Sequence, residues 1–202
     1  MSKTFYRNMY KVFAGAIRRL FRITVIGREN EPADGPFLIC ANHLSYFDVV
    51  IIAASLRNQV RYLAKAELFK IPLLNTLIRA LGAFPVKRGE NDVGAIRNTI
   101  KILQNGEVVG IYPQGTRRPG VHPAETPLKN GMGMVVCRAQ TAILPIAIIT
   151  DKFKVGMFKK TTVRIGTPIP YEELAVTGNS QEEYRRITQM AFDRVIDLVN
   201  TQ

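Results

Sequence analysis

The chain is poor in the residues that build disulfide networks and metal sites. Its 202 residues include two cysteines, Cys40 and Cys137, and two histidines, His43 and His122. Both cysteines stand among apolar neighbours, which favours buried, reduced thiols of a cytosolic protein over a disulfide. So few thiol and imidazole groups, scattered along the chain, argue against a zinc site, and no metal is expected.

The sequence also lacks a Gly/Ser-rich linker, an internal repeat and a low-complexity tract that would divide it. With 47% hydrophobic residues it can bury a substantial core and is predicted to form a single domain. Acidic residues are few: 16 Asp and Glu stand against 28 Lys and Arg, a formal net charge of +12. This excess indicates an anionic partner, which could be nucleic acid, a phospholipid surface, an acidic protein or a phosphorylated substrate.

No acidic residue occurs among the first 22 residues, which are predicted to form an amphipathic helix. Its wide aromatic face and purely basic opposite face favour a helix lying on an anionic membrane, with the domain proper at 23–202. Alternatively, the helix packs on its own domain. Charges are too frequent for a transmembrane span, and no signal-peptide cleavage site is evident. The apolar positions are Phe5, Tyr6, Met9, Tyr10, Val12, Phe13, Ala16, Ile17, Leu20 and Phe21, and the basic ones are Arg7, Lys11, Arg18, Arg19 and Arg22.

Strand-like apolar runs alternate with helical patterns along the rest of the chain. This alternation predicts an α/β sandwich with a mixed, mainly parallel sheet flanked by helices. The C-terminal part, from Tyr171 onward, is predicted to be a loop and one amphipathic packing helix. The expected strands are 23–26, 37–41, 60–64, 83–86, 108–112, 142–149 and 162–165, and the expected helices are 47–55, 73–81, 93–104, 132–140 and 182–200.

His43 and Asp48 are the most informative pair in the sequence. A histidine beside a carboxylate can remove a proton from an alcohol near neutral pH. Residues five apart point about 140° away from each other on a straight helix, so the pair meets only if the chain turns between them. Asn42 and Ser45, both helix-capping residues after an apolar strand, predict that turn. Taken alone, the pair favours a structural histidine that caps a helix, with the aspartate near the helix N-terminus; the motifs that follow reverse this preference.

Two further polar clusters follow predicted strands. Lys87 and Arg88 come after the strand at 83–86, and Gln114 to Arg118 come after the strand at 108–112. Each cluster could hold a phosphate through its cations and the backbone N–H groups around a glycine. Either cluster alone could be a basic surface turn, but the two together with His43 and Asp48, all at predicted strand ends, favour a shared site.

Four blocks of the sequence resemble, in order and approximate spacing, those of the glycerolipid acyltransferases of the 1-acylglycerol-3-phosphate type. Two intervening stretches, at 65–72 and 129–131, are also similar, and the resemblance covers roughly residues 23–165. It implies an acyltransferase fold, a fatty-acyl thioester donor and a lysophospholipid acceptor. The four blocks are 43–48, 84–89, 113–117 and 144–146.

The resemblance implies a role for individual residues. His43 matches the family's general base and Asp48 the carboxylate that orients it. Arg88 matches a cation that binds the acceptor phosphate, and Pro145 matches the proline of the fourth block. Gln114 stands where the family usually has glutamate, and a glutamine cannot act as an acid or base at ordinary pH. The remaining expected substrate-binding residues are Lys65, Lys87, Gln114, Gly115, Thr116 and Arg117.

The implied reaction is direct attack of the acceptor hydroxyl on the thioester, with backbone N–H groups after His43 as candidate oxyanion donors. Neither Ser45 nor Cys40 lies in a G-x-S-x-G elbow, so no acyl-enzyme is expected. Acyl-CoA or acyl carrier protein would be the co-substrate, without another cofactor, at the cytoplasmic face of the membrane as a peripheral or monotopic protein. The alternatives are an acyltransferase for another lyso-lipid and a non-catalytic lipid-binding protein. Signatures of nucleic-acid binding are missing from the sequence.

Overall fold

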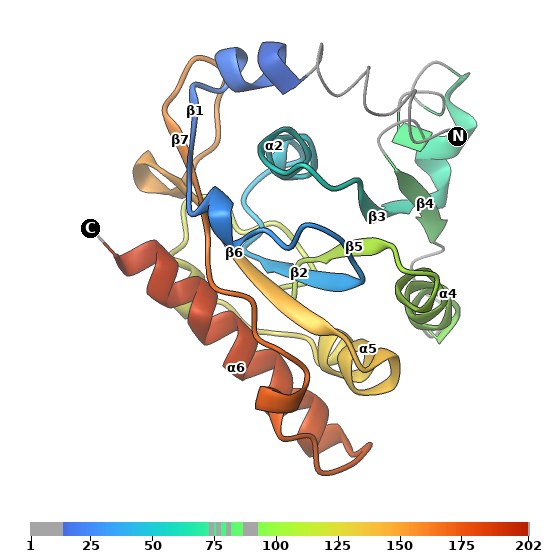
Figure 1. The fold of residues 1–202 in the computed structure, drawn as a ribbon. Helices are drawn as coiled ribbons and strands as arrows, with labels where there is room; N and C mark the ends of the chain where they lie inside the picture. Colours follow the sequence, from blue (N-terminus) through green and yellow to red (C-terminus); the bar gives the residue numbers. More distant parts are fainter. Residues whose placement is uncertain (1–13, 73–74, 76–77, 80–81, 87–92, 202) are drawn as a thin grey trace.

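The computed structural model describes residues 14–72, 75, 78–79, 82–86 and 93–201. Seven strands form one sheet in the order β1-β7-β6-β2-β5-β3-β4 (Figure 1). Neighbouring strands are parallel except β6 and β7, which are antiparallel. The predicted α/β class and the mixed, mainly parallel sheet are thereby confirmed. The strands are β1 (Ile23–Ile26), β2 (Phe37–Ala41), β3 (Val60–Lys65), β4 (Ala83–Val86), β5 (Val108–Ile111), β6 (Ala142–Thr150) and β7 (Thr161–Ile165).

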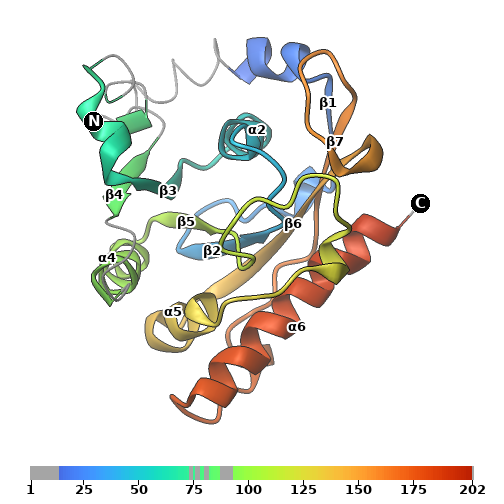
Figure 2. The same ribbon diagram turned by 180° about the vertical axis from the view of Figure 1, so that it is seen from behind.

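Helices cover both faces of the sheet (Figures 1 and 2). On one face lies α2 (Asp48–Ser55); on the other lie α4 (Val93–Gln104), α5 (Gly131–Ala139) and α6 (Gln181–Asn200). The predicted C-terminal packing helix is confirmed, since α6 buries its apolar side in the core. Of the predicted N-terminal helix, residues 14–20 are helical, whereas residues 1–13 lie outside the described residues. Its membrane-facing surface therefore remains a prediction.

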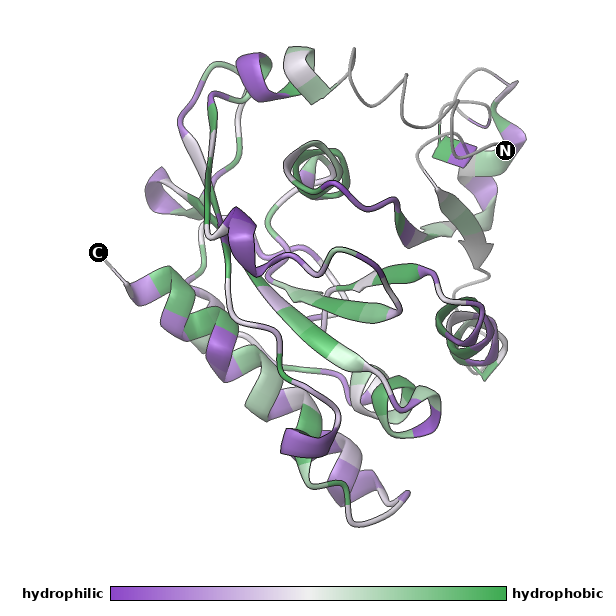
Figure 3. Ribbon diagram, in the orientation of Figure 1, coloured by the Kyte–Doolittle hydropathy of each residue, from purple (hydrophilic) through white to green (hydrophobic). Residues whose placement is uncertain are grey.

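The central strand β2 explains how the sequence specifies two packed layers. All five of its residues are buried. Phe37 and Ile39 pack on the side of α2, whereas Leu38 and Cys40 pack on the side of α5 and α6. A parallel strand covered on both faces needs an uninterrupted apolar run rather than an alternating one. Figure 3 shows the corresponding concentration of apolar residues in the central strands.

Four parallel neighbours, β2, β5, β3 and β4, bring their carboxyl ends to the same edge of the sheet. Cys40 in β2 pairs with Ile111 in β5, and Lys65 at the end of β3 pairs with Val86 at the end of β4. The polar segments that follow these strands therefore start side by side. Ligand sites of open α/β sheets are usually formed at this edge.

Candidate active site

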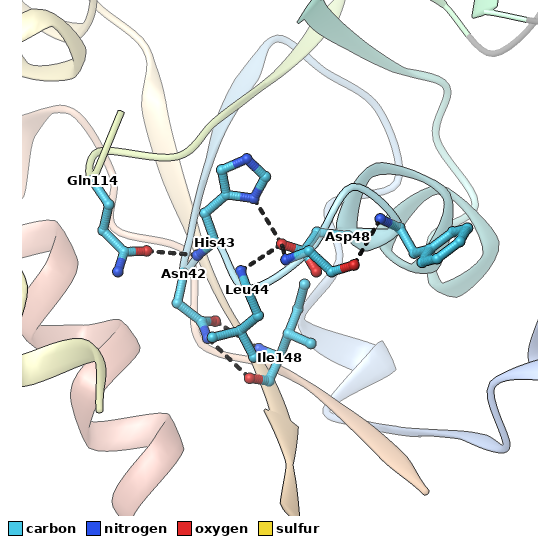
Figure 4. A network of polar contacts seen from close by, with 8 residues as sticks. Asn42, His43, Leu44, Asp48, Gln114 and Ile148 are labelled. Atoms are coloured by element: carbon cyan, nitrogen blue, oxygen red, sulfur yellow. Dashed lines mark hydrogen bonds and ion pairs between the residues drawn. The ribbon is translucent and has the colours of Figure 1, made fainter. Parts of the chain in front are cut away.

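His43 and Asp48 meet because the chain turns after β2 before α2 begins. Nδ1 of His43 lies 2.7 Å from Oδ2 of Asp48 (Figure 4). Asn42 fixes the start of the turn: its side-chain N–H donates to the carbonyl of Ile148 at 2.9 Å, and its side-chain oxygen accepts from the N–H of Ile148 at 2.7 Å. The amide of Asn42 thus continues the contact between β2 and β6 after the regular pairing has ended.

One side-chain oxygen of Asp48 makes several of the polar contacts that hold this turn. Besides the imidazole of His43, Oδ2 of Asp48 accepts the backbone N–H of Leu44 at 2.6 Å and that of Ser45 at 2.8 Å. Asp48 is fully buried, whereas the His43 side chain retains 16% exposure. A carboxylate at the first position of α2 is also favoured by the helix dipole. The two N–H groups are engaged with Asp48, so the predicted oxyanion donors do not include those of Leu44 and Ser45.

Gln114 holds the backbone of His43 from the other side. Its Oε1 accepts the N–H of His43 at 2.6 Å, and its Nε2 donates to Oγ1 of Thr126 at 2.8 Å. The Thr126 hydroxyl in turn donates to the carbonyl of Pro123 at 2.6 Å. Gln114 is only 2% exposed. With both ends of its amide bonded inside the protein, Gln114 positions the histidine from behind, rather than facing an open binding surface.

Tyr112, the first residue after β5, stacks on the imidazole ring of His43. The ring centroids of His43 and Tyr112 are 4.2 Å apart, with 15° between the ring planes. Burial, together with the nearby Tyr62 and Asp48, raises the pKa of the Tyr112 hydroxyl well above its usual value. The phenol therefore stays neutral, and its contribution is orientation of the imidazole through stacking.

The segment that carries Gly115, Thr116 and Arg117 is tied to the histidine. The N–H of Arg118 donates to the carbonyl of His43 at 2.8 Å. Gly115 adopts φ +67, and a Cβ there would lie 2.6 Å from the Lys129 side chain, so the tight turn favours glycine. Thr116 is exposed.

Arg117 belongs to the same segment and lines a hollow in the protein surface. Its guanidinium carbon is 3.3 Å from the centroid of the Tyr46 ring, a cation–π contact. Together with Ser45 and Lys154, these two residues line a hollow of about 530 Å³. The hollow joins a cation and an aromatic surface to the turn of His43, which suits a ligand with an anionic group and an apolar part.

The structure does not test the other predicted binding cations. Lys65 ends β3, but the position of its side chain is not described, and Lys87 and Arg88 lie outside the described residues. Pro145 is buried in β6, paired with Cys40 of β2, and contributes to the core beneath the site. His122 packs its ring edge-on against Phe153 and contacts Asn200, consistent with a structural role.

The two cysteines are free and buried, as predicted. Burial raises the pKa of the Cys40 thiol far above its usual value, so Cys40 is not an activated nucleophile. Within the described segments, no group of three or more metal-ligating side chains occurs.

Asn42, Tyr112 and Thr126 have contacts in the site that were not predicted from the sequence. Each acts through a residue distant in the chain: Asn42 bonds Ile148, and Tyr112 stacks on His43. The only signals available were the place of Asn42 immediately after one predicted strand and that of Tyr112 at the end of another; Thr126 had none. Such positions indicate proximity to the site, but not which group the side chain contacts.

Comparison with known proteins agrees with this geometry. The acyltransferase family pattern matches residues 22–149. The chain is 31% identical to the 1-acyl-sn-glycerol-3-phosphate acyltransferase of Bacillus subtilis, covering 95% of this chain and 98% of that protein. It is 30% identical to the corresponding enzyme of Borreliella burgdorferi, over 89% and 72% of the two chains. The crystal structure of the 1-acyl-sn-glycerophosphate acyltransferase from Thermotoga maritima matches with a TM-score of 0.68 and 25% identity, over 96% of this chain and 83% of that one. The chain therefore belongs to the acyltransferase family.

Proposed function

We propose that the protein transfers a fatty acyl group from an acyl thioester to the free hydroxyl of 1-acylglycerol-3-phosphate, giving phosphatidic acid. The observation that carries this proposal is the 2.7 Å contact between His43 and the buried Asp48, at the carboxyl end of β2 in a chain of this family. The named relatives act on the same acceptor.

His43 is the general base of the proposed reaction. With a carboxylate at Nδ1, that nitrogen carries the proton, and Nε2 is left to take the proton of the acceptor hydroxyl. The acceptor oxygen attacks the thioester carbonyl, a tetrahedral intermediate forms, and the carbon–sulfur bond breaks. The departing thiolate takes the proton back from the imidazolium of His43. Asp48 holds the ring and stabilises its charged form between these steps.

Direct transfer fits the chemistry of the neighbouring nucleophiles. The Ser45 hydroxyl oxygen accepts the N–H of Phe47 at 3.2 Å, as a turn residue does. Cys40 is fully buried within β2. Neither has a general base arranged to activate it, whereas His43 is bonded to its own carboxylate. The reaction therefore needs no acyl-enzyme.

Arg117 is proposed to bind the acceptor phosphate, because its guanidinium lies beside the hollow next to His43. Gly115 and Thr116 would contribute through the same turn. Lys65 ends β3, and Lys87 and Arg88 follow β4 in the sequence. These three residues are proposed as further cations of the substrate site.

The test is an assay of thiol release from acyl-CoA and from acyl carrier protein, with and without lysophosphatidic acid. We expect release that depends on the acceptor, and a kcat about 100- to 10,000-fold lower for His43→Ala. Ser45→Ala is the matched control and should retain most activity. A stable acylated serine or cysteine, or full activity of His43→Ala, would contradict the proposed mechanism. A panel of lyso-lipids without phosphate tests the acceptor: equal turnover of these would assign the protein to another lyso-lipid.

A second experiment tests the phosphate site. Arg117→Ala should raise the KM for lysophosphatidic acid more than the KM for acyl-CoA, because only the acceptor places its phosphate there. Arg117→Lys, which retains the charge but not the planar fork, should have an intermediate effect. Equal changes for both substrates would remove Arg117 from the acceptor site.

The proposed place of action is the cytoplasmic face of the membrane, with peripheral attachment. In the chain as described, no helix combines the length and hydropathy that crossing a bilayer requires. The acceptor and the product are both lipids, so the enzyme has to work at a lipid surface.

A further inference from the structure

The connection between β6 and β7, residues 151–160, exposes two large apolar side chains. Met157 is 56% exposed and Phe158 is 71% exposed. Isolated exposed apolar residues are common, but here the pair is adjacent and is surrounded by lysines. The segment has one acidic residue, Asp151, and its lysines Lys152, Lys154, Lys159 and Lys160 are all exposed.

The fold holds this connection in place. The N–H of Phe158 donates to the carbonyl of Leu20 at 2.6 Å, and the N–H of Gly120 donates to the carbonyl of Phe153 at 2.9 Å. Phe158 itself adopts φ 62, the left-handed region that an aromatic residue rarely occupies. The backbone is therefore strained at a residue whose ring is mostly exposed and contributes little to the core. Strain of this kind at an exposed residue points to a function outside the folding of the domain.

Two aromatic residues of the active-site turn lie beside this connection. Tyr46 is 76% exposed and Phe47 is 44% exposed. The Phe47 ring packs on buried Phe21 with centroids 5.0 Å apart, and Phe21 follows Leu20, the partner of Phe158. Lys154 of the connection lines the same hollow as Tyr46 and Arg117. Tyr46, Phe47, Met157 and Phe158, with the lysines at 154, 159 and 160, form what we call the docking edge.

The geometry points to an anionic lipid bilayer as the partner of the docking edge. Aromatic and methionine side chains enter the boundary between headgroups and acyl chains, while lysines bind lipid phosphates. An acidic protein would satisfy the lysines but not the exposed Met157 and Phe158. The inference rests on the proposed function in one respect: it places the hollow beside His43 at the headgroup level, where a lysophospholipid presents its phosphate.

The sequence contains no tryptophan, so an introduced one reports its own surroundings alone. Phe158→Trp should shift its emission to the blue and be quenched by brominated lipid when vesicles of equal parts phosphatidylcholine and phosphatidylglycerol are added. Val93→Trp is the matched control: Val93 is also 56% exposed, but it lies on α4, which packs against β5 and α5 and not beside the connection between β6 and β7. An unchanged emission at position 158 under conditions where the protein binds the vesicles would overturn the inference.

Vesicle sedimentation measures separately how much the lysines and the apolar side chains of the docking edge contribute to binding. Each cation near an anionic surface contributes about fivefold to partitioning, so Lys159→Gln with Lys160→Gln should weaken binding about tenfold or more. Met157→Ser with Phe158→Ser should weaken it by a similar factor. Val93→Ser with Lys101→Gln, on α4, should have no effect. Loss of binding to acyl carrier protein, with vesicle binding intact, would assign the edge to a protein partner instead.

An activity assay keeps this inference separate from the proposed function. With a short-chain 1-acylglycerol-3-phosphate dissolved as monomers, the docking-edge variants should turn over like the wild type, and with vesicle-bound acceptor they should be slower. If the wild type transfers no acyl group but the tryptophan signal appears, the proposed function fails and the docking edge stands. If transfer is normal and all variants bind vesicles alike, the inference about the docking edge is refuted and the proposed function stands.

Discussion

Gln114 shows how a single side-chain amide can fix the backbone position of His43, the proposed general base. One end accepts the N–H of His43 and the other donates to Thr126, whose own proton goes to Pro123. A glutamate at this position would still accept the N–H of His43. It could not donate to Thr126, so the Thr126 hydroxyl would have to donate its proton to the carboxylate. The departure from the glutamate usual in the family is therefore compatible with a positioning role, which does not need an ionisable group.

We predict that Gln114→Leu lowers both stability and kcat, because it leaves the His43 N–H unpaired in a buried place, at a cost of about 1–3 kcal/mol. Gln114→Glu keeps that bond and should retain more activity than Gln114→Leu. Thermal unfolding and kcat measure the two effects, with exposed Gln104→Leu as control. The opposite order of the two variants would show that Gln114 acts on the substrate instead.

At the scale of secondary structure elements, Asn42 connects β2 to β6 where their ladder ends. The last regular pair is Ala41 with Ile146, and the Asn42 amide then bonds both the N–H and the carbonyl of Ile148. We predict that Asn42→Ala lowers the free energy of unfolding by about 2–4 kcal/mol, since two buried backbone groups lose their partner. Urea unfolding measures this, and Asn98→Ala, on the exposed side of α4, should change stability little. A near-neutral effect of Asn42→Ala would mean that water replaces the amide.

The start of α6 predicts a dependence of stability on pH. The Arg186 guanidinium, together with the N–H of Thr177, lowers the pKa of the Glu183 carboxyl to about 2. The ordinary value is 4.5, so the folded state favours the charged form, and its stabilising effect is present above about pH 4.5 and is lost toward pH 2. We predict that Glu183→Gln is less stable than the wild type at pH 7 and that the difference disappears as the pH falls through this window. Unfolding curves at several pH values test this, and a constant difference would contradict it.

At the scale of the whole molecule, the formal charge of +12 predicts that binding to anionic lipid depends strongly on salt. Raising the ionic strength from about 0.1 M to about 1 M shortens the screening length from about 10 Å to about 3 Å. Sedimentation with phosphatidylglycerol vesicles should therefore decrease sharply over this range, while binding to pure phosphatidylcholine should be weak throughout. Equal binding at both salt concentrations would show that apolar insertion alone attaches the protein.

Local patterns predicted the elements well because each strand carries its own signal. β2 and β6 are buried on both faces, so their apolar runs stand out without knowledge of their neighbours. The same patterns could not give the strand order, in which β7 lies between β1 and β6, parallel to β1 and antiparallel to β6. Pairing between distant strands leaves no mark in a short window of sequence.

The sequence by itself determined the α/β class, the seven strands, and a histidine and an aspartate separated by a turn. These follow from periodicity, from turn-forming residues and from the chemistry of the two side chains. Only the tertiary structure decided which groups hold that pair. The partner of the His43 N–H is 71 residues away, and that of Asn42 is 106 residues away. Contacts of such separation depend on how the strands are ordered in the sheet, and that order is a property of the packed chain.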